Sequence, residues 1–168
     1  SKYTTVKVDV AVTNVSDTPG KDVVELYYTP PYTKGGIEKS AMNLVAFEKT
    51  EVLDAGETQV VTLTFDIYDM ASYDCYDDNA NYFSGYELDP GEYTLRLMTD
   101  AHTPADCENA TATFFVENTG TEAEPVGYKY RQDPTTKQLV RNRFTGEGAY
   151  AGCPVDGRFA NPTAYFSR

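Results

Sequence analysis

The side chains best suited to chemistry are gathered in one segment, residues 68–86, where acidic and amide residues are interspersed with aromatic ones. The acidic and amide members are Asp74, Asp77, Asp78, Asn79 and Asn81. Carboxylate and amide oxygens are the ligands that calcium prefers, but the spacing here matches no calcium-loop signature. We therefore expect a solvated acidic loop in which Asp side chains accept hydrogen bonds from the local backbone. Calcium binding stays open as the alternative.

Aromatic side chains in the same segment could contact a sugar, because an aromatic face stacks on a pyranose ring. The candidates for contact with a sugar or another domain are Tyr76, Asp77, Asp78, Tyr82 and Phe83. A loop of this length in a compact domain is often functional. Other tyrosines, such as Tyr27, Tyr28 and Tyr93, fall at strand positions and are expected to pack in the core or across strands.

No catalytic constellation can be assigned from the sequence. The chain has 26 acidic residues, so two carboxyls about 5 Å apart, as retaining glycoside hydrolysis needs, would arise by chance. The one histidine, His102, lies in a loop, and no Gly-x-Ser-x-Gly elbow accompanies it. Cys75, Cys107 and Cys153 are too far apart for a zinc motif and are expected to be free buried thiols, with one disulfide as the alternative. The sequence predicts no catalytic residue, no cofactor site and no metal ligand.

The elements that position these side chains are strands. Val6, Val8, Val10 and Val12 recur at every second position, which puts them on one face of a strand. Further strand patterns cover Val23–Thr29, Leu44–Leu53, residues 60–65, 93–97 and 112–116. Turns rich in Gly, Pro, Asn and Asp separate them, and no segment has the pattern of a long helix. Short strands at regular spacing predict an all-β, immunoglobulin-like β-sandwich.

The length and net charge of the chain limit the number of domains it can form and the kinds of partner it can bind. A chain of 168 residues is expected to be one domain, or one domain with an extension. A net charge of -12 argues against binding to nucleic acid or to an anionic membrane surface. No apolar run approaches the roughly 20 residues that span a bilayer. No signal peptide is recognisable, so we expect a segment of a longer polypeptide or a protein whose signal has been removed.

The composition changes near residue 119. Residues 120–168 carry 7 basic and 5 acidic side chains, a net charge of +2, whereas the preceding part is strongly acidic. We expect a β-sandwich over residues 1–118 and an irregular aromatic and basic extension over 119–168. Because disordered segments are poor in aromatics, the extension should pack on the sandwich or on a neighbouring domain. The candidates for interdomain contact are Arg141, Arg143, Phe144 and Tyr165.

Six motifs in order give the chain a family resemblance. They are Val10–Asn14, Gly20–Tyr28 followed by Pro30 and Pro31, Leu44–Lys49, Ala55–Thr58, Asp69–Asp74 and Pro90–Leu95. Together they resemble the fibronectin type III-like domain of glycoside hydrolase family 3, the β-glucosidase family. In the extension, Asn142–Gly146, Val155–Gly157 and Tyr165–Arg168 look like the connector to the barrel in members with inverted domain order.

The resemblance implies a non-catalytic role. Family 3 enzymes use an Asp nucleophile, usually in a Ser-Asp-Trp-like motif on the barrel, and this chain has no tryptophan. The Lys-His pair that helps the barrel bind sugar is absent too, because Ala101 precedes His102. The resemblance predicts an accessory module that orients the catalytic domains of a β-glucosidase, its partners. The alternatives are a carbohydrate-binding module for glucan or xylan and an extracellular spacer or adhesion domain.

Overall fold

A computed structural model describes residues 1–120, 126–133 and 136–139 of the chain. The chain folds into two compact units. The first unit comprises residues 1–30, 41–70 and 92–114, and the second comprises residues 31–40, 71–91 and 115–168. Each unit is therefore assembled from three separate stretches of the chain.

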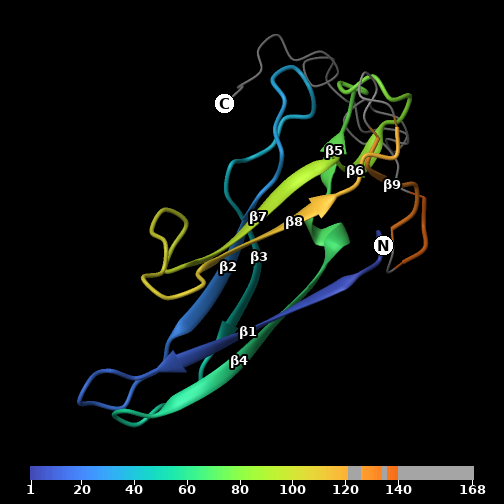
Figure 1. Cartoon of the computed structure of the whole chain (residues 1–168). Helices are drawn as coiled ribbons and strands as arrows, with labels where there is room; N and C mark the ends of the chain where they lie inside the picture. Colours follow the sequence, from blue (N-terminus) through green and yellow to red (C-terminus); the bar gives the residue numbers. More distant parts are fainter. Residues whose placement is uncertain (121–125, 134–135, 140–168) are drawn as a thin grey trace, which may run out of the picture. The chain divides into compact units, whose positions relative to one another are not determined.

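Two antiparallel sheets build the first unit (Figure 1). One contains β1 (Thr5–Thr13) and β4 (Thr58–Asp66), paired over nine positions from Thr5–Asp66 to Thr13–Thr58. The other has the order β3 (Asn43–Lys49), β2 (Val23–Thr29), β7 (Gly91–Met98), β8 (Thr111–Val116). The short 3-10 helix η1 (Ile67–Met70) follows β4. The predicted β-sandwich is confirmed.

Side-chain alternation places the core of this sandwich. In β4, Val61, Leu63 and Phe65 are buried while the threonines between them are exposed, as the period of two requires. Leu26 of β2 and Leu95 of β7 contribute from the other sheet. A register shift between Leu26 and Tyr27 breaks the alternation in β2, so that consecutive residues 26–28 are all buried. Tyr28 and Tyr27 thus belong to the core, as expected.

The second unit contains a three-stranded antiparallel sheet with the order β5 (Ser72–Asp74), β6 (Gly85–Leu88), β9 (Tyr128–Tyr130). Tyr73 and Tyr86 lie opposite each other in β5 and β6, with their rings edge to face at 4.9 Å. The segment 68–86, expected to be a loop throughout, thus begins with η1 and β5, and only residues 75–84 connect strands. The extension likewise contributes a strand, β9, which the sequence pattern does not predict.

Cysteine packing differs from the expectation in one respect. Cys107 is a free thiol but is exposed, and Cys75 is only half-buried. Cys153 lies outside the described residues.

The predicted strand over Leu44–Leu53 ends at Lys49. Leu53 forms an isolated bridge with Gly20 instead.

Candidate functional site

The loop between β5 and β6, residues 75–84, is shaped by two carboxylates. Asp74, 1% exposed, accepts hydrogen bonds from the backbone N–H groups of Tyr76 (3.1 Å), Asp78 (3.0 Å) and Asn79 (3.5 Å). Asp77 is the second carboxylate and organises the later half of the loop. Local carboxylate-to-backbone bonding of this kind was the expected arrangement, and it makes the loop a defined structure.

Asp77 also stabilises an unusual backbone. Its carboxylate accepts hydrogen bonds from the N–H groups of Asn81 (2.8 Å), Tyr82 (3.0 Å) and Phe83 (3.3 Å). Asp77, Ala80 and Tyr82 have φ values of 58°, 55° and 61°. Left-handed conformations at residues other than glycine are strained by about 1–3 kcal/mol each and persist only where surrounding contacts impose them. Here the Asp77 carboxylate supplies part of that constraint.

The aromatic candidates fall into two environments. Tyr82 is 92% exposed and Tyr76 is 37% exposed, so both present ring surface to solvent. Phe83 is buried within the second unit. Two cations of the extension lie over its ring, Lys129 with Nζ 5.7 Å and Arg131 with its guanidinium 5.1 Å from the centroid. Tyr82 and Tyr76 are therefore the contact candidates at the surface, while Phe83 joins the loop to the extension.

Glu87 is the residue of this region that sequence reasoning missed. It lies on β6, is 2% exposed, and accepts hydrogen bonds at Oε2 from the side-chain amides of Asn79 (3.2 Å) and Asn81 (2.5 Å). Burial raises the pKa of Glu87 to about 7. The two amides and Lys129 oppose this rise in pKa, whereas the Asp74 carboxylate adds to it. A strand pattern alone gives no signal for a buried carboxylate, because its partners come from a loop.

Asp78 lies beside the same carboxylates. Desolvation raises the pKa of its side chain, and the charges of Asp74, Glu38 and Asp77 raise it further. Three like charges around one exposed side chain make this part of the loop electronegative. Asp77 and Asp78 thus have different roles: Asp77 holds the loop, and Asp78 contributes surface charge.

A second buried charge fixes another segment of this unit. Lys39 is 8% exposed and donates hydrogen bonds to the main-chain oxygen of Pro31 (3.0 Å) and to the carboxylate of Asp89. A buried ammonium is tolerated only when it is paired and hydrogen-bonded. The pair therefore ties residues 31–40 to the turn after β6.

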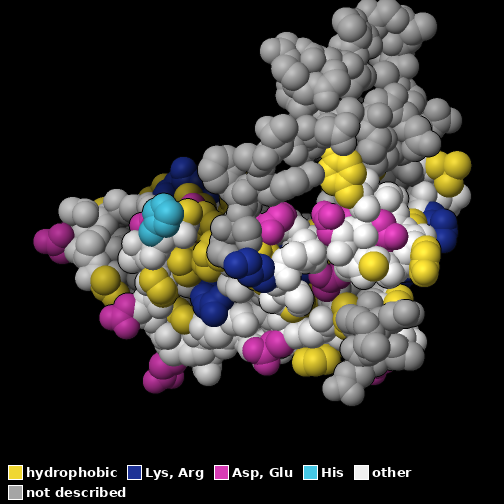
Figure 2. Space-filling model, turned by 90° about the horizontal axis from the view of Figure 1, so that it is seen from above, with side chains coloured by type: hydrophobic (Ala, Val, Ile, Leu, Met, Phe, Trp, Pro, Cys, Tyr) yellow, Lys and Arg dark blue, Asp and Glu magenta, His cyan; other side chains and the backbone are white. Residues whose placement is uncertain are grey.

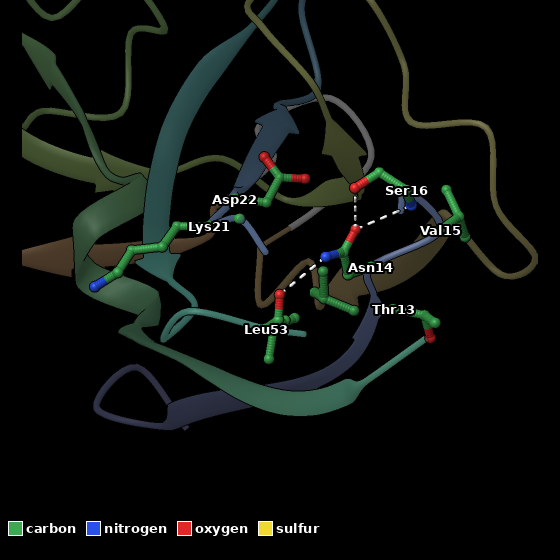
Figure 3. A pocket seen from close by; sticks show the side chains of 9 residues that line it. Thr13, Asn14, Val15, Ser16, Lys21, Asp22 and Leu53 are labelled. Carbon is green, nitrogen blue, oxygen red and sulfur yellow. Dashed lines mark hydrogen bonds between the residues drawn. The ribbon is translucent and has the colours of Figure 1, made fainter. Parts of the chain in front are cut away.

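A hollow of about 290 Å³ in the first unit offers no comparable chemistry (Figure 3). It lies at the turn after β1 and is lined by Asn14, Ser16, Lys21 and Leu53, among others. The Asn14 amide donates to the main-chain oxygens of Thr18 (2.8 Å) and Leu53 (2.9 Å). Its oxygen accepts from the hydroxyl of Ser16 at 2.8 Å. Lys21 extends away from these side chains (Figure 3). The polar atoms of Asn14 are thus occupied in holding the turn.

His102 is exposed in the loop between β7 and β8, and the one cyan side chain of Figure 2 shows it at the surface. Asp100 accepts hydrogen bonds from the N–H groups of His102 (2.7 Å) and Thr103 (3.0 Å), which lower the pKa of its carboxyl. In the part of the chain that the structure describes, no three His, Cys, Asp or Glu side chains are placed to hold a metal ion. No described helix has the length and apolarity to cross a membrane.

The extension carries four residues that were predicted to contact another domain. Arg141, Arg143, Phe144 and Tyr165 lie outside the described residues. The described part of the extension includes β9, whose Lys129 lies opposite Glu87, and a turn in which Asp133 accepts hydrogen bonds from the N–H and hydroxyl groups of Thr136. Through β9 the extension thus pairs with β6 in the sheet of the second unit.

Comparison with known proteins identifies one domain of the chain. Residues 22–101 match the sequence profile of the fibronectin type III-like domain. The chain carries a fibronectin type III-like domain. Its relatives confirm the resemblance to the domain found in family 3 β-glucosidases.

Two curated relatives and one solved structure show how the chain with this fibronectin type III-like domain compares with larger enzymes. It is 42% identical over 90 residues to β-glucosidase A of Butyrivibrio fibrisolvens, covering 54% of the chain and 10% of that protein. It is 32% identical over 164 residues to a β-glucosidase of Ruminococcus albus, covering 88% of the chain and 17% of that protein. A β-glucosidase structure from Paenibacillus barengoltzii aligns with a TM-score of 0.56 and 31% identity, covering 75% of this chain and 12% of that one. The chain thus spans less than a fifth of the length of the curated relatives.

Proposed function

We propose that the chain is the non-catalytic accessory module of a family 3 β-glucosidase, in which it orients and stabilises the catalytic domains. The observation that carries the proposal is the match to the Ruminococcus albus β-glucosidase, which runs through 88% of the chain and accounts for 17% of that enzyme. A similar segment that forms a small part of a much larger enzyme is expected to support chemistry located elsewhere in it.

Two features of the second unit suit such a role. The loop 75–84 holds a fixed backbone through Asp74 and Asp77, so its exposed Tyr82 can meet a partner surface with little loss of conformational entropy. The extension is joined to β6 through β9, and the sequence after β9 is rich in basic and aromatic residues. An acidic sandwich and a basic extension offer a neighbouring domain surfaces of both signs.

The test distinguishes an accessory role of the chain from catalysis by the chain itself. The 168-residue chain is first assayed alone with 4-nitrophenyl β-glucoside, and we expect no turnover. It is then titrated in a calorimeter against the separately produced catalytic domains of the same polypeptide, and we expect saturable binding. Turnover by the chain alone would overturn the accessory role, and so would failure to bind the catalytic domains.

Sugar contact is a second candidate, favoured by the exposure of Tyr82 and Tyr76 on one rigid loop. It predicts that calorimetric titration with cello-oligosaccharides, xylo-oligosaccharides or soluble β-glucan gives measurable heat and a micromolar dissociation constant. It also predicts that Tyr82→Ala abolishes the heat while Tyr3→Ala, a change at a tyrosine that is 57% exposed in the first unit, does not. No heat across the panel would eliminate this candidate and leave the accessory role standing.

A further inference from the structure

We propose that a second copy of this chain pairs with the open edge of β1, so that the β1–β4 sheets of two copies join into one continuous sheet. β1 runs through nine residues in regular register with β4 and contains no proline. Within the described residues β4 is the only strand hydrogen-bonded to it, and β4 in turn lies beside β3. A long, regular and uncovered edge is a template for a further strand. The inference is independent of the proposed accessory role.

The hydrogen bonds at the two ends of β1 show which main-chain groups the edge presents. Asn14 donates its N–H to the main-chain oxygen of Glu57 (2.9 Å), and Ile67 donates its N–H to that of Thr4 (3.0 Å). Alternate residues of an antiparallel strand bond to the same neighbour, so the even-numbered residues of β1 bond to β4. The odd-numbered residues direct their N–H and C=O groups to the open edge, where the described part of the chain offers them no main-chain partner. Those at the centre of the strand are Lys7, Asp9 and Ala11.

The inward face of β1 is only partly covered. Its four valines are half-buried, although the β4 residues opposite three of them, Val61, Leu63 and Phe65, are at most 4% exposed. The exposed apolar surface therefore lies at the margin of the sheet, on the side of β1 that faces away from β4. A strand added at this margin would cover that surface, and removing apolar surface from water is favourable.

The charges of β1 make a second β1 a complementary partner in one register. When two copies of β1 run antiparallel with Val8 opposite Val8, Lys7 of each copy lies opposite Asp9 of the other. The main-chain groups allow the register to move only in steps of two residues, and one step in either direction places Lys7 opposite Lys7 or Asp9 opposite Asp9. Opposite charges across two strands stabilise the pair, whereas like charges destabilise it. Asp9 accepts a hydrogen bond from Thr62 at Oδ1 (2.6 Å), which leaves Oδ2 for the ammonium of the second copy.

Two copies joined in this way form a closed dimer, because each copy has one β1 and the same surface is used on both. The interface consists of one strand pair and the valines beside it, which places it among the small interfaces. We therefore expect weak association, with a dissociation constant on the order of 10–100 µM.

The first test is sedimentation velocity of the 168-residue chain over concentrations that bracket this constant, and the mass should rise from that of a monomer to that of a dimer. Ala11→Pro removes one N–H from the open edge and leaves the bonds to β4 in place, so it should remain a monomer. Ala11→Val keeps the N–H and is the matched control, which should associate like the parent chain. A parent chain that is monomeric throughout, or an Ala11→Pro chain as dimeric as the parent, would overturn the proposal.

Charge reversal tests the register. Lys7→Asp makes the edge wholly acidic and Asp9→Lys makes it wholly basic, so each variant alone should associate more weakly by roughly tenfold or more. An equimolar mixture of the two should form a heterodimer, because every charge then lies opposite its counterpart. Asp54→Lys, the same change of charge in the turn before β4, is the control and should dimerise like the parent. If circular dichroism shows both edge variants folded and their mixture stays monomeric, the second copy does not pair in this register and the proposal is wrong.

Discussion

At the scale of single residues, Asp77 is the side chain on which the loop depends most. One carboxylate satisfies three backbone N–H groups and thereby supports left-handed conformations at non-glycine positions. Asp78, the next residue, is exposed and lies among like charges. Two adjacent aspartates therefore differ sharply in what they contribute to the folded state.

This difference gives a paired prediction. Asp77→Ala should lower the free energy of unfolding by about 1–3 kcal/mol, because it leaves backbone donors without their acceptor. Asp78→Ala should change it by less than about 0.5 kcal/mol, as exposed substitutions usually do. Urea unfolding followed by circular dichroism measures both values. Equal losses in the two variants would contradict the role assigned to Asp77.

The raised pKa of Tyr28 predicts how the free energy of unfolding changes at alkaline pH. Burial, with a smaller contribution from Asp69, raises the pKa of its hydroxyl from 10.0 to about 12 in the folded chain. A phenol whose folded pKa exceeds its unfolded pKa stabilises the fold fully below pH 10 and loses that contribution as the pH rises towards 12. Tyr28→Phe should therefore flatten the fall in unfolding free energy between pH 9.5 and 11.5, by an amount on the order of 1–3 kcal/mol. An identical fall in both proteins would refute the assignment.

At the scale of elements, the sequence predicted the strands whose side chains alternate and missed those defined by their partners. Alternation of apolar and polar side chains predicts β1 and β4, because one face of each strand is apolar and the other polar. The apolar face carries the valines in β1 and Val61, Leu63 and Phe65 in β4. β5 and β9 have three residues each, too few for a period to show. Glu87 of β6 was missed for a related reason: a charged residue on a buried face is explained only by Asn79 and Asn81, which approach from the loop.

The strand β9 predicts where the chain can be shortened. A chain ending at residue 139 keeps β9, whereas one ending at residue 118 loses it together with the cations over Phe83. We expect amide hydrogen exchange at β6 to accelerate at least tenfold in the shorter chain, with β4 still protected in both. Unchanged protection of β6 in the shorter chain would show that β9 is dispensable.

Gly127 allows a test of the same pairing by point substitution. A Cβ at this position would collide with the main-chain oxygen of Leu88, so Gly127→Ala should displace the extension from β6. In this full-length variant we expect the same faster exchange at β6 that we predict for the truncated chain. Gly20→Ala is the matched control, because a Cβ at Gly20 meets no atom within 4 Å. Equal exchange rates in the two variants would argue against close apposition at Gly127.

At the scale of the whole molecule, the way the chain is divided between its units determines how it should unfold. The second unit consists of residues 31–40, 71–91 and 115–168, and the chain enters it from the first unit each time. Its described strands have three or four residues, and strands this short need further packing to be stable. We therefore predict that the second unit unfolds when the first unit does.

Leu63→Ala tests this dependence. Leu63 is 1% exposed in β4, and removing such a side chain destabilises a core by about 2–5 kcal/mol. Because the substitution lies in the first unit, the amides of β4 should report a lower urea midpoint of unfolding. The amides of β6 should report the same lowered midpoint. Val60→Ala, at a neighbouring position of β4 that is 60% exposed, should leave both midpoints nearly unchanged. If β6 kept its original midpoint in Leu63→Ala, the two units would be separate folding units, and the loop with Asn79, Asn81 and Glu87 would be stable without the sandwich.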